Sequence, residues 1–320
     1  MTSFPTRFPV ICGPTAGGKT AAAVALAHLL RERGFTAEVI TADAYQIYKG
    51  MDIGTAKPSL AEREGVPHHL IDLIEPTERF TLDQWLGAAE AKIDELKSRG
   101  VIPIVVGGTH LYIKALMEGL FEGPAADPVL RAQLEAMPPA DRRAELERID
   151  PAAAVRIHPN DLRRTVRALE VFRLTGKPIT EHQGQWDRPG GARPDAQLVA
   201  LNWPTELLNR RINARVKQMM EQGLLDEVRR IAAAPGFGPQ AGEALGYKQL
   251  RPLLNGQNQP RQSSIEEAIE RIKIETRRFG KNQRTWLKRL SLIQGCLAID
   301  ASAQTSQQIA QTIAKSILND

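Results

Sequence analysis

Short apolar segments alternate with amphipathic segments over the first third of the chain. Residues 7–12 and 37–43 read RFPVIC and AEVITAD and have the pattern of short strands, and residues 101–109 read VIPIVVGGT, a continuous apolar run typical of a buried parallel strand. Residues 20–34 and 81–100 between them have the spacing of helices, and Thr81 followed by Gln84 forms a capping-box pattern. The alternation of strand and helix predicts a P-loop NTPase-like α/β core with a mainly parallel sheet flanked by helices.

The pattern changes after Gly119. Residues 121–186 are polar, rich in helix formers and interrupted by proline, without strand alternation. Core-like strands return at 197–203 and 296–302, and the glycine- and proline-containing segment 188–195 is the expected hinge. We therefore predict a catalytic core from residues 1–120 and 190–320, with an all-helical insertion domain at 121–189.

The composition is that of an ordinary globular protein, with 42% hydrophobic and 25% charged residues. The two cysteines, Cys12 and Cys296, imply no disulfide framework and fit a reducing cytoplasm. The N-terminus lacks the apolar region of a signal peptide, and no run of eighteen apolar residues occurs. We expect a cytoplasmic protein that does not span a membrane.

A glycine-rich loop follows the first predicted strand and precedes the first predicted helix. It matches G-x-x-x-x-G-K-[ST] at Gly13, Pro14, Thr15, Ala16, Gly17, Gly18, Lys19 and Thr20. Such a loop binds anionic oxygens through backbone N–H groups, the helix N-terminus and the lysine, and the Thr20 hydroxyl can ligate Mg²⁺. The loop predicts a diphosphate-like ligand; ATP is the common one, and a glycine turn without ligand is the alternative.

Polar residues end the second and third predicted strands of the core. Asp43 can hold Mg²⁺ through water, act as a general base, or simply cap a turn. The run from Val101 to Val106 ends in Gly107, Gly108 and Thr109, without the carboxylate that assists attack on a γ-phosphate. This absence weakens an ATPase interpretation and makes Thr109 a candidate substrate contact.

Basic residues gather in two segments. Residues 156–177 hold six Lys/Arg against two acids, and residues 271–289 hold eight against one. In the second segment we expect a basic helix face of Arg277, Lys281, Arg284 and Lys288, and a buried face of Ile272, Phe279 and Trp286. A solvated basic surface is the simple explanation, but two such segments beside a phosphate loop favour RNA.

Other polar residues carry weaker signals. Arg211 and Arg215 share a helix face, and either can clamp a diphosphate or be an ordinary surface arginine. The adjacent His68 and His69 favour a structural role over a metal site.

Several segments together resemble the bacterial tRNA dimethylallyltransferase family, also called tRNA isopentenyltransferase or IPP transferase. These segments are GPTAGGKT, DAYQIYKGMDIGTAKP, GVPHHLID, VVGGTHLYIKAL, RIHPNDLRRTVRALEVF, EALGYKQL and TRRFGKNQRTWLKR. They occur in the family's order over almost the whole chain, and MDIGTAKP is far more specific than the glycine loop.

The resemblance implies transfer of a dimethylallyl group to N6 of adenosine 37, next to the tRNA anticodon. The loop would then bind the diphosphate of dimethylallyl diphosphate with Mg²⁺ on Thr20. Lys19 and Arg215 would stabilise the leaving diphosphate, Asp43 would accept the amine proton, and Thr109 would orient the adenine. The family acts on the anticodon stem-loop, and we expect a monomer.

The resemblance also implies which residues contact tRNA. They are Asp43, Ala44, Tyr45, Gln46, Arg163, Arg164, Thr165, Val166, Arg167, Glu243, Ala244, Leu245, Gly246, Tyr247 and Lys248. The chain departs from the family at Ala44, Glu243, Gly280 and Asn282. The first two departures affect the expected tRNA contacts more than the chemistry.

Three other functions are consistent with parts of the sequence. An adenylate isopentenyltransferase would use free nucleotide and would not need the basic insertion. A P-loop small-molecule kinase conflicts with the missing acid after Val106. A non-catalytic RNA-binding module would leave Lys19, Thr20 and Asp43 without a role.

Overall fold

The computed structural model describes residues 4–119, 123–183, 193–254 and 262–318. The chain forms two compact units, one from Met1–Met117 with Ala192–Asp320 and the other from Glu118–Gly191. Residues 188–192 of the expected hinge lie outside the described residues. Each unit has its own apolar core and is described separately.

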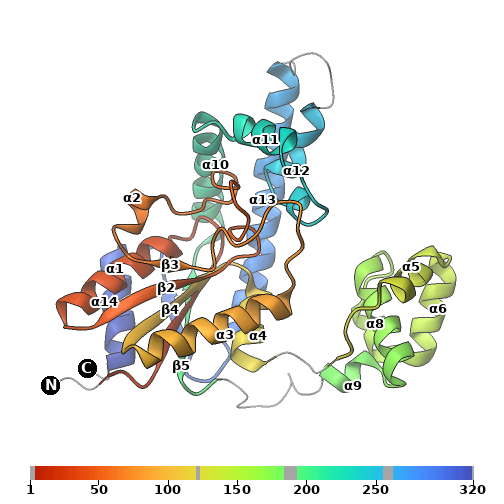
Figure 1. Cartoon of the computed structure of the whole chain (residues 1–320), viewed down its shortest axis with the longest axis horizontal. Helices are drawn as coiled ribbons and strands as arrows, with labels where there is room; N and C mark the ends of the chain where they lie inside the picture. The colour runs from red at the N-terminus through yellow and green to blue at the C-terminus, as the bar shows by residue number, and fades with distance from the viewer. Residues whose placement is uncertain (1–3, 120–122, 184–192, 255–261, 319–320) are drawn as a thin grey trace. The chain divides into compact units, whose positions relative to one another are not determined.

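A six-stranded sheet with the order β3-β2-β4-β1-β5-β6 forms the centre of the first unit (Figure 1). Its strands are β1 Phe8–Cys12, β2 Thr36–Ala42, β3 His68–His69, β4 Val101–Gly107, β5 Ala196–Asn202 and β6 Leu297–Asp300. Every strand pair is parallel, so the loops at the carboxyl ends of β1, β2 and β4 meet at one edge. The predicted parallel α/β core is confirmed, and the two-residue β3 was not predicted.

Helices cover both faces of the sheet because successive strand side chains alternate between them. Ile11, Ile104 and Val199 pack with α1 (Lys19–Glu32) and α14 (Ser306–Leu318) on one face. On the other face, Val10 and Val105 pack with α3 (Leu82–Ser98), α4 (His110–Glu118) and the end of α13 (Gln262–Leu290). Thr81 and Gln84 form the predicted capping box of α3.

A second layer of helices packs on the loop after β2. Its elements are α10 Thr205–Glu221, α11 Leu224–Ala233, η2 Ala241–Glu243, α12 Tyr247–Leu250, η3 Arg251–Leu254 and the first half of α13, with the short α2 Leu60–Arg63 nearby along the chain. Tyr247 and Ile272 join Ile47, Tyr48 and Met51 in one apolar cluster. This cluster connects the C-terminal helices to the segment that follows Asp43.

The buried face of α13 differs from the expected one. Ile272 is buried, but Phe279 is 42% exposed, and Gly280 and Gln283 are buried instead. A Cβ at Gly280 would lie 3.2 Å from Ile212 Cδ1 of α10, so the glycine permits the close approach of these helices. The prediction for Phe279 was wrong because apolar spacing alone does not show which helix face receives a partner.

The second unit contains helices and connecting loops, with no strand among its described residues. It contains α5 Pro128–Ala136, α6 Pro139–Ile149, α7 Pro151–Arg156, α8 Leu162–Thr175 and α9 Ile179–Gln183. Asp127, Asp150 and Asp161 cap the starts of α5, α7 and α8, and Leu134, Leu146 and Leu169 form part of its core. The all-helical character of the insertion agrees with the sequence prediction.

Candidate active site

The glycine-rich loop joins β1 to α1 and has the curled backbone that its sequence predicts. Ala16 and Gly18 have positive φ values of 58° and 78°, and the Gly17 N–H donates to Pro14 O at 3.1 Å. The Lys19 amine donates to the same Pro14 oxygen at 2.8 Å. The loop is therefore a tight turn that ends at the N-terminus of α1, where an anion is favoured.

Two side chains, one just after β5 and one from α10, bond to carbonyl groups of this loop. Arg211 Nε donates to Ala16 O at 2.7 Å, and Trp203 Nε1 donates to Gly17 O at 3.1 Å. The Arg211 guanidinium also lies 4.6 Å from the centroid of a Trp203 ring. Arg211 also lines the pocket beside the loop, so it both fixes the loop backbone and adds positive charge near a ligand there.

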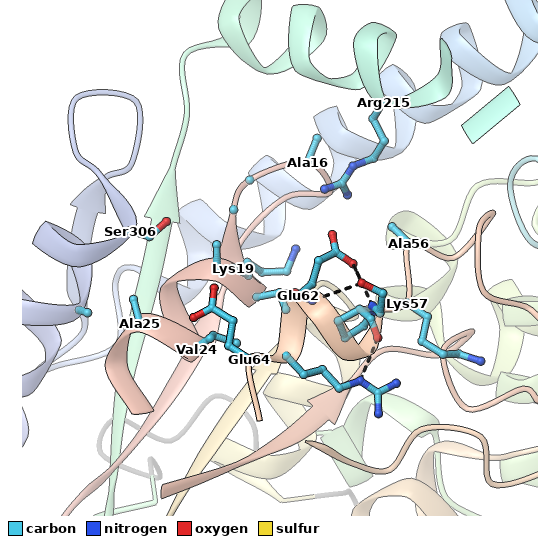
Figure 2. A pocket seen from close by; sticks show the side chains of 18 of the residues that line it. Ala16, Lys19, Val24, Ala25, Ala56, Lys57, Glu62, Glu64, Arg215 and Ser306 are labelled. Atoms are coloured by element: carbon cyan, nitrogen blue, oxygen red, sulfur yellow. Dashed lines mark hydrogen bonds between the residues drawn. The ribbon is translucent and has the colours of Figure 1, made fainter. Parts of the chain in front are cut away.

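A pocket of about 1110 Å³ opens beside the loop and is lined by residues from Ala16 to Thr20, by α10 and by the 52–58 segment. Lys19 and Arg215 point toward this space from the loop and from α10 (Figure 2). Burial, followed by the charge of Arg215, lowers the pKa of Lys19 to about 8, against the opposing effect of Asp43. Burial also lowers the pKa of Arg215. Two desolvated cations facing one pocket favour a dianionic or more highly charged ligand.

Asp43 and Thr109 meet at the carboxyl ends of β2 and β4. Asp43 Oδ1 accepts hydrogen bonds from the N–H groups of Tyr45 at 2.9 Å and Gln46 at 3.3 Å, and Thr109 Oγ1 accepts one from Ala44 N at 3.0 Å. Burial raises the pKa of Asp43, while the two backbone bonds and Lys19 oppose the shift. A desolvated carboxylate of this kind is a better proton acceptor than an exposed one.

Close packing of β2 on β4 makes this meeting possible. Gly107 pairs with Ala42, and a Cβ at Gly107 would lie only 1.9 Å from Ala42 O. The Thr109 N–H then donates to that same Ala42 oxygen at 3.3 Å. A glycine therefore ends β4, because the backbone of β2 approaches this position too closely for a side chain. Asp43 and Thr109 do not line the pocket beside the loop, and the electrostatic effect of Asp43 on Lys19 links the two groups of residues.

Tyr45 and Gln46, also predicted to contact tRNA, are partly exposed beside Asp43. Gln46 Nε2 donates to Thr55 O at 3.2 Å and to Ala56 O at 3.1 Å, which ties this turn to the 52–58 segment. The departure at Ala44 leaves the bond from its backbone N–H to Thr109 intact.

The predicted tRNA contacts at 243–248 divide into two groups. Glu243 and Lys248 are exposed and form an ion pair at 2.6 Å, whereas Ala244, Gly246 and Tyr247 are buried, and Leu245 is partly buried. Tyr247 instead donates to the buried Glu227 at 2.5 Å. Burial, together with this carboxylate, raises the pKa of Tyr247, so the hydroxyl stays protonated.

The insertion residues divide in the same way. Arg163 and Arg164 are exposed on α8, but Thr165 and Val166 are buried in the insertion's own core. Arg167 Nη1 donates to the fully buried Glu170 at 2.5 Å, and its Nη2 donates to Pro124 O at 2.9 Å. Thr165, Val166 and Arg167 therefore hold this unit together, which the resemblance did not indicate.

The basic face expected on α13 is partly used inside the protein. Arg277 donates to Asn213 at 2.7 Å and Arg284 donates to Thr205, both on α10, while Lys281 and Lys288 are exposed. His69 contacts Glu38 at 2.6 Å and His68 contacts Val66 O at 2.8 Å, in agreement with a structural role.

The residues present fit Mg²⁺ held mainly by a ligand's oxygens. Mg²⁺ commonly uses one or two protein groups plus water and phosphate, and Thr20 lines the pocket at the start of α1. Within the described ranges, no group of three His, Cys, Asp or Glu side chains is arranged to hold a metal by itself.

A search of the described helices for a membrane span, based on their length and hydropathy, finds none.

Gln283 and Glu227 were missed by the sequence analysis, although each is buried and bonded to backbone near the site. Gln283 lies inside the segment TRRFGKNQRTWLKR, which carries part of the family resemblance, but the resemblance predicted no role for it. A polar residue at an apolar position of a strongly periodic helix is the signal that identifies such groups.

A parallel α/β fold with a glycine-rich loop at β1–α1, and with Lys19 and Arg215 facing one pocket, defines a P-loop protein whose pocket suits a phosphate-containing ligand. The family model for IPP transferase matches residues 46–290, and that for isopentenyl transferase matches residues 6–75. The chain belongs to the IPP transferase family.

Its relatives and structural neighbours agree with this assignment. A tRNA dimethylallyltransferase of Thermomicrobium roseum is 43% identical over 297 residues, covering 90% of this chain and 86% of that protein. One of Bacillus licheniformis is 44% identical over 295 residues, with 88% of each covered. The crystal structure of a tRNA isopentenylpyrophosphate transferase from Bacillus halodurans matches with a TM-score of 0.68 and 35% identity, covering 98% and 97% of the chains. A eukaryotic dimethylallyltransferase acting on tRNA matches with a TM-score of 0.80 and 30% identity, covering 98% of this chain and 79% of that one.

Proposed function

We propose that this protein transfers a dimethylallyl group from dimethylallyl diphosphate to N6 of adenosine 37, next to the anticodon of tRNA. The observation that supports it most directly is the pairing of two partly buried cations, Lys19 and Arg215, with a partly buried carboxylate, Asp43, whose charge acts on Lys19. The cations suit a leaving diphosphate, and the carboxylate suits a proton acceptor. The names of the relatives support the same substrates.

In this reaction a bond forms between N6 and the allylic carbon while the bond from that carbon to the diphosphate oxygen breaks. The loop amides, Lys19 and Arg215 bind the diphosphate and stabilise the charge that develops on it. Asp43 accepts the proton that the amine loses, and Thr109 orients the adenine. Mg²⁺ at Thr20, when bound, supplies further positive charge to the diphosphate oxygens.

Positioning carries much of the catalysis because an adenine amine is a weak nucleophile. The base must leave its stack to reach an allyl group at the carboxyl edge of the sheet. Of the family's tRNA-binding positions, Arg163, Arg164 and Lys248 are exposed cations that suit phosphates, and Lys248 would exchange its ion pair with Glu243 for such a contact. We propose that they contact the anticodon stem-loop and that the enzyme acts as a monomer in the cytoplasm.

An assay with competing substrates tests this function. The protein is incubated with Mg²⁺, dimethylallyl diphosphate and either unmodified tRNA or AMP, and digested nucleosides are analysed by mass spectrometry. We expect N6-dimethylallyladenosine from tRNA, and none from a matched tRNA with guanosine at position 37. Product from AMP alone would identify an adenylate isopentenyltransferase instead, and phosphoryl transfer from ATP in a parallel incubation would identify a kinase.

A further inference from the structure

The side chain of Gln283 joins two loops of the candidate site from a third, distant part of the chain. It projects from α13, is 4% exposed, and accepts a hydrogen bond from Thr15 N at Oε1 over 2.8 Å. Its Nε2 donates to Gly108 O at 2.9 Å. One carboxamide therefore links the phosphate loop after β1 to the segment after β4 that carries Thr109.

This arrangement requires a side chain that donates and accepts at the same time. Glutamine does both, a glutamate carboxylate can only accept, and methionine of similar length replaces neither bond. The space is also tight, because a Cβ at Gly108 would lie 2.8 Å from Gln283 Nε2 and 3.4 Å from Lys19 Nζ. Gln283 Nε2 and the amine expected to bind the leaving diphosphate thus both lie next to Gly108.

The helix that carries Gln283 is itself fixed to the other side of the loop. Arg277 and Arg284 of α13 bond to Asn213 and Thr205 of α10, while Arg211 of α10 bonds to Ala16 O. The paired helices α10 and α13 therefore hold the phosphate loop at both Thr15 and Ala16. Arg211 bonds to the loop beside the pocket that it lines, and Gln283 reaches to Gly108.

We propose that Gln283 is a positioning residue that fixes the separation between the bound diphosphate and the adenine held at Thr109. It acts through the backbone of Thr15 and Gly108 and does not touch the reacting atoms. Since the Thr15 N–H is already bonded to Gln283, loss of the side chain leaves the diphosphate-binding groups in place and loosens their distance to Thr109. The proposal rests on the proposed prenyl transfer.

The test compares Gln283→Met with Gln197→Met, since Gln197 is also a buried glutamine bonded to backbone carbonyls. Gln197 is 4% exposed, bonds to Leu198 O and Gly295 O, and pairs with Pro9 near the start of β1, away from the carboxyl edge. We expect Gln283→Met to lower kcat about 10- to 100-fold, as a displacement of about 1 Å can do, with KM for dimethylallyl diphosphate changed less than about threefold. Gln197→Met should lower Tm by a similar amount and leave kcat unchanged.

Two additional measurements make the outcome decisive. Gln283→Glu keeps the acceptor for Thr15 N–H but loses the donor to Gly108 O, so it too should lower kcat. It provides the test of the proposal if the methionine variant does not fold. Hydrogen exchange of the 13–18 segment should be faster in Gln283→Met than in Gln197→Met. Wild-type kcat in folded Gln283 variants, or unchanged exchange, overturns the proposal. A wild-type protein that transfers no prenyl group instead refutes the proposed function, and the exchange result alone then decides whether Gln283 holds the two loops.

Discussion

Burial acts in opposite directions on the two charged side chains that matter most to the proposed chemistry. It raises the pKa of Asp43, which makes this carboxylate a better proton acceptor. It lowers the pKa of Lys19, because a charged amine is less stable here without an anion, and a bound diphosphate would stabilise that charge. Replacing Asp43 by Asn keeps the size of the side chain and removes the acceptor of the proton. We expect kcat to fall about 10²- to 10⁴-fold, with the Kd for tRNA nearly unchanged in filter binding. A large loss of affinity with normal turnover would show that Asp43 binds tRNA and does not act as a base.

The same two residues predict the pH dependence of kcat/KM for the prenyl donor. Asp43 works as a carboxylate, so activity should be lost as pH falls through its raised pKa, above the usual range of aspartate. Lys19 works as a cation, so activity should also fall as pH rises through about 8 in the free enzyme. Lys19→Arg keeps its charge at every accessible pH and should remove the alkaline limb even if the overall rate is lower. An alkaline limb that persists near pH 8 in this variant would assign it to another group.

At the scale of elements, the segment 52–54 is held by a single buried carboxylate. Glu227 of α11 is 1% exposed and accepts hydrogen bonds from the N–H groups of Asp52, Ile53 and Gly54 at 2.9–3.2 Å, and from Tyr247. A Cβ at Gly54 would lie 2.3 Å from the Tyr247 ring, so the segment packs directly against it. This explains in physical terms why glycine occurs in the MDIGTAKP motif.

Removing that carboxylate should destabilise the protein strongly. We expect Glu227→Ala to lower the free energy of unfolding by about 3 kcal/mol, because each buried donor left unsatisfied costs about 1–3 kcal/mol. Urea denaturation followed by circular dichroism measures this change. The matched control is Glu221→Ala at an exposed position of α10, which should change stability by less than about 0.5 kcal/mol. Equal effects of the two substitutions would mean that water replaces Glu227 without cost.

The local sequence pattern predicts well the strands and helices of the core, which alternate along the chain. The strands β1, β2, β4, β5 and β6 and the helix α3 follow from apolar runs and a capping box, and the approach of Asp43 to Thr109 follows from their places at strand ends. Helix periodicity can indicate that Glu227 and Gln283 are buried, but it cannot predict which groups they bond to. The backbone groups that bond to Glu227 lie 173 to 175 residues away in the sequence, and those that bond to Gln283 lie 175 to 268 residues away. No periodicity of the sequence encodes a polar contact at such separation.

At the scale of the whole molecule, the net charge of +5 does not show how many arginines are bonded within the protein and how many are free to meet a ligand. Many arginines serve the fold: Arg131 and Arg167 neutralise the buried Glu170, and the resulting ion pairs hold the pKa of that carboxyl low despite burial. Arg142 donates to three carbonyls around the end of α5. The number of basic residues in a segment therefore overstates the charge available to RNA.

The exposed arginines of α8 give the last prediction. Arg163 and Arg164 project from the first turn of this helix, and Arg164 retains 70% exposure although it pairs with Asp161 at 3.3 Å. If they contact tRNA phosphates, the double variant Arg163→Ala/Arg164→Ala should weaken tRNA binding and flatten the plot of log Kd against log salt by about 0.7 to 0.9 per lost contact. Catalysis at saturating tRNA should be nearly unaffected, because neither residue touches the prenyl donor in the proposed mechanism.

A control within the same insertion separates a specific contact from a general loss of charge. Arg148 is exposed on α6 and carries the same charge, so Arg148→Ala should leave the salt slope as it is in the wild type. Arg167→Ala should lower Tm more than either of these variants, because it removes one of the two arginines that pair with the buried Glu170. If the double variant and Arg148→Ala change the salt slope equally per removed charge, the insertion contributes only a diffuse positive field. If only the double variant changes it, the first turn of α8 lies against the RNA backbone.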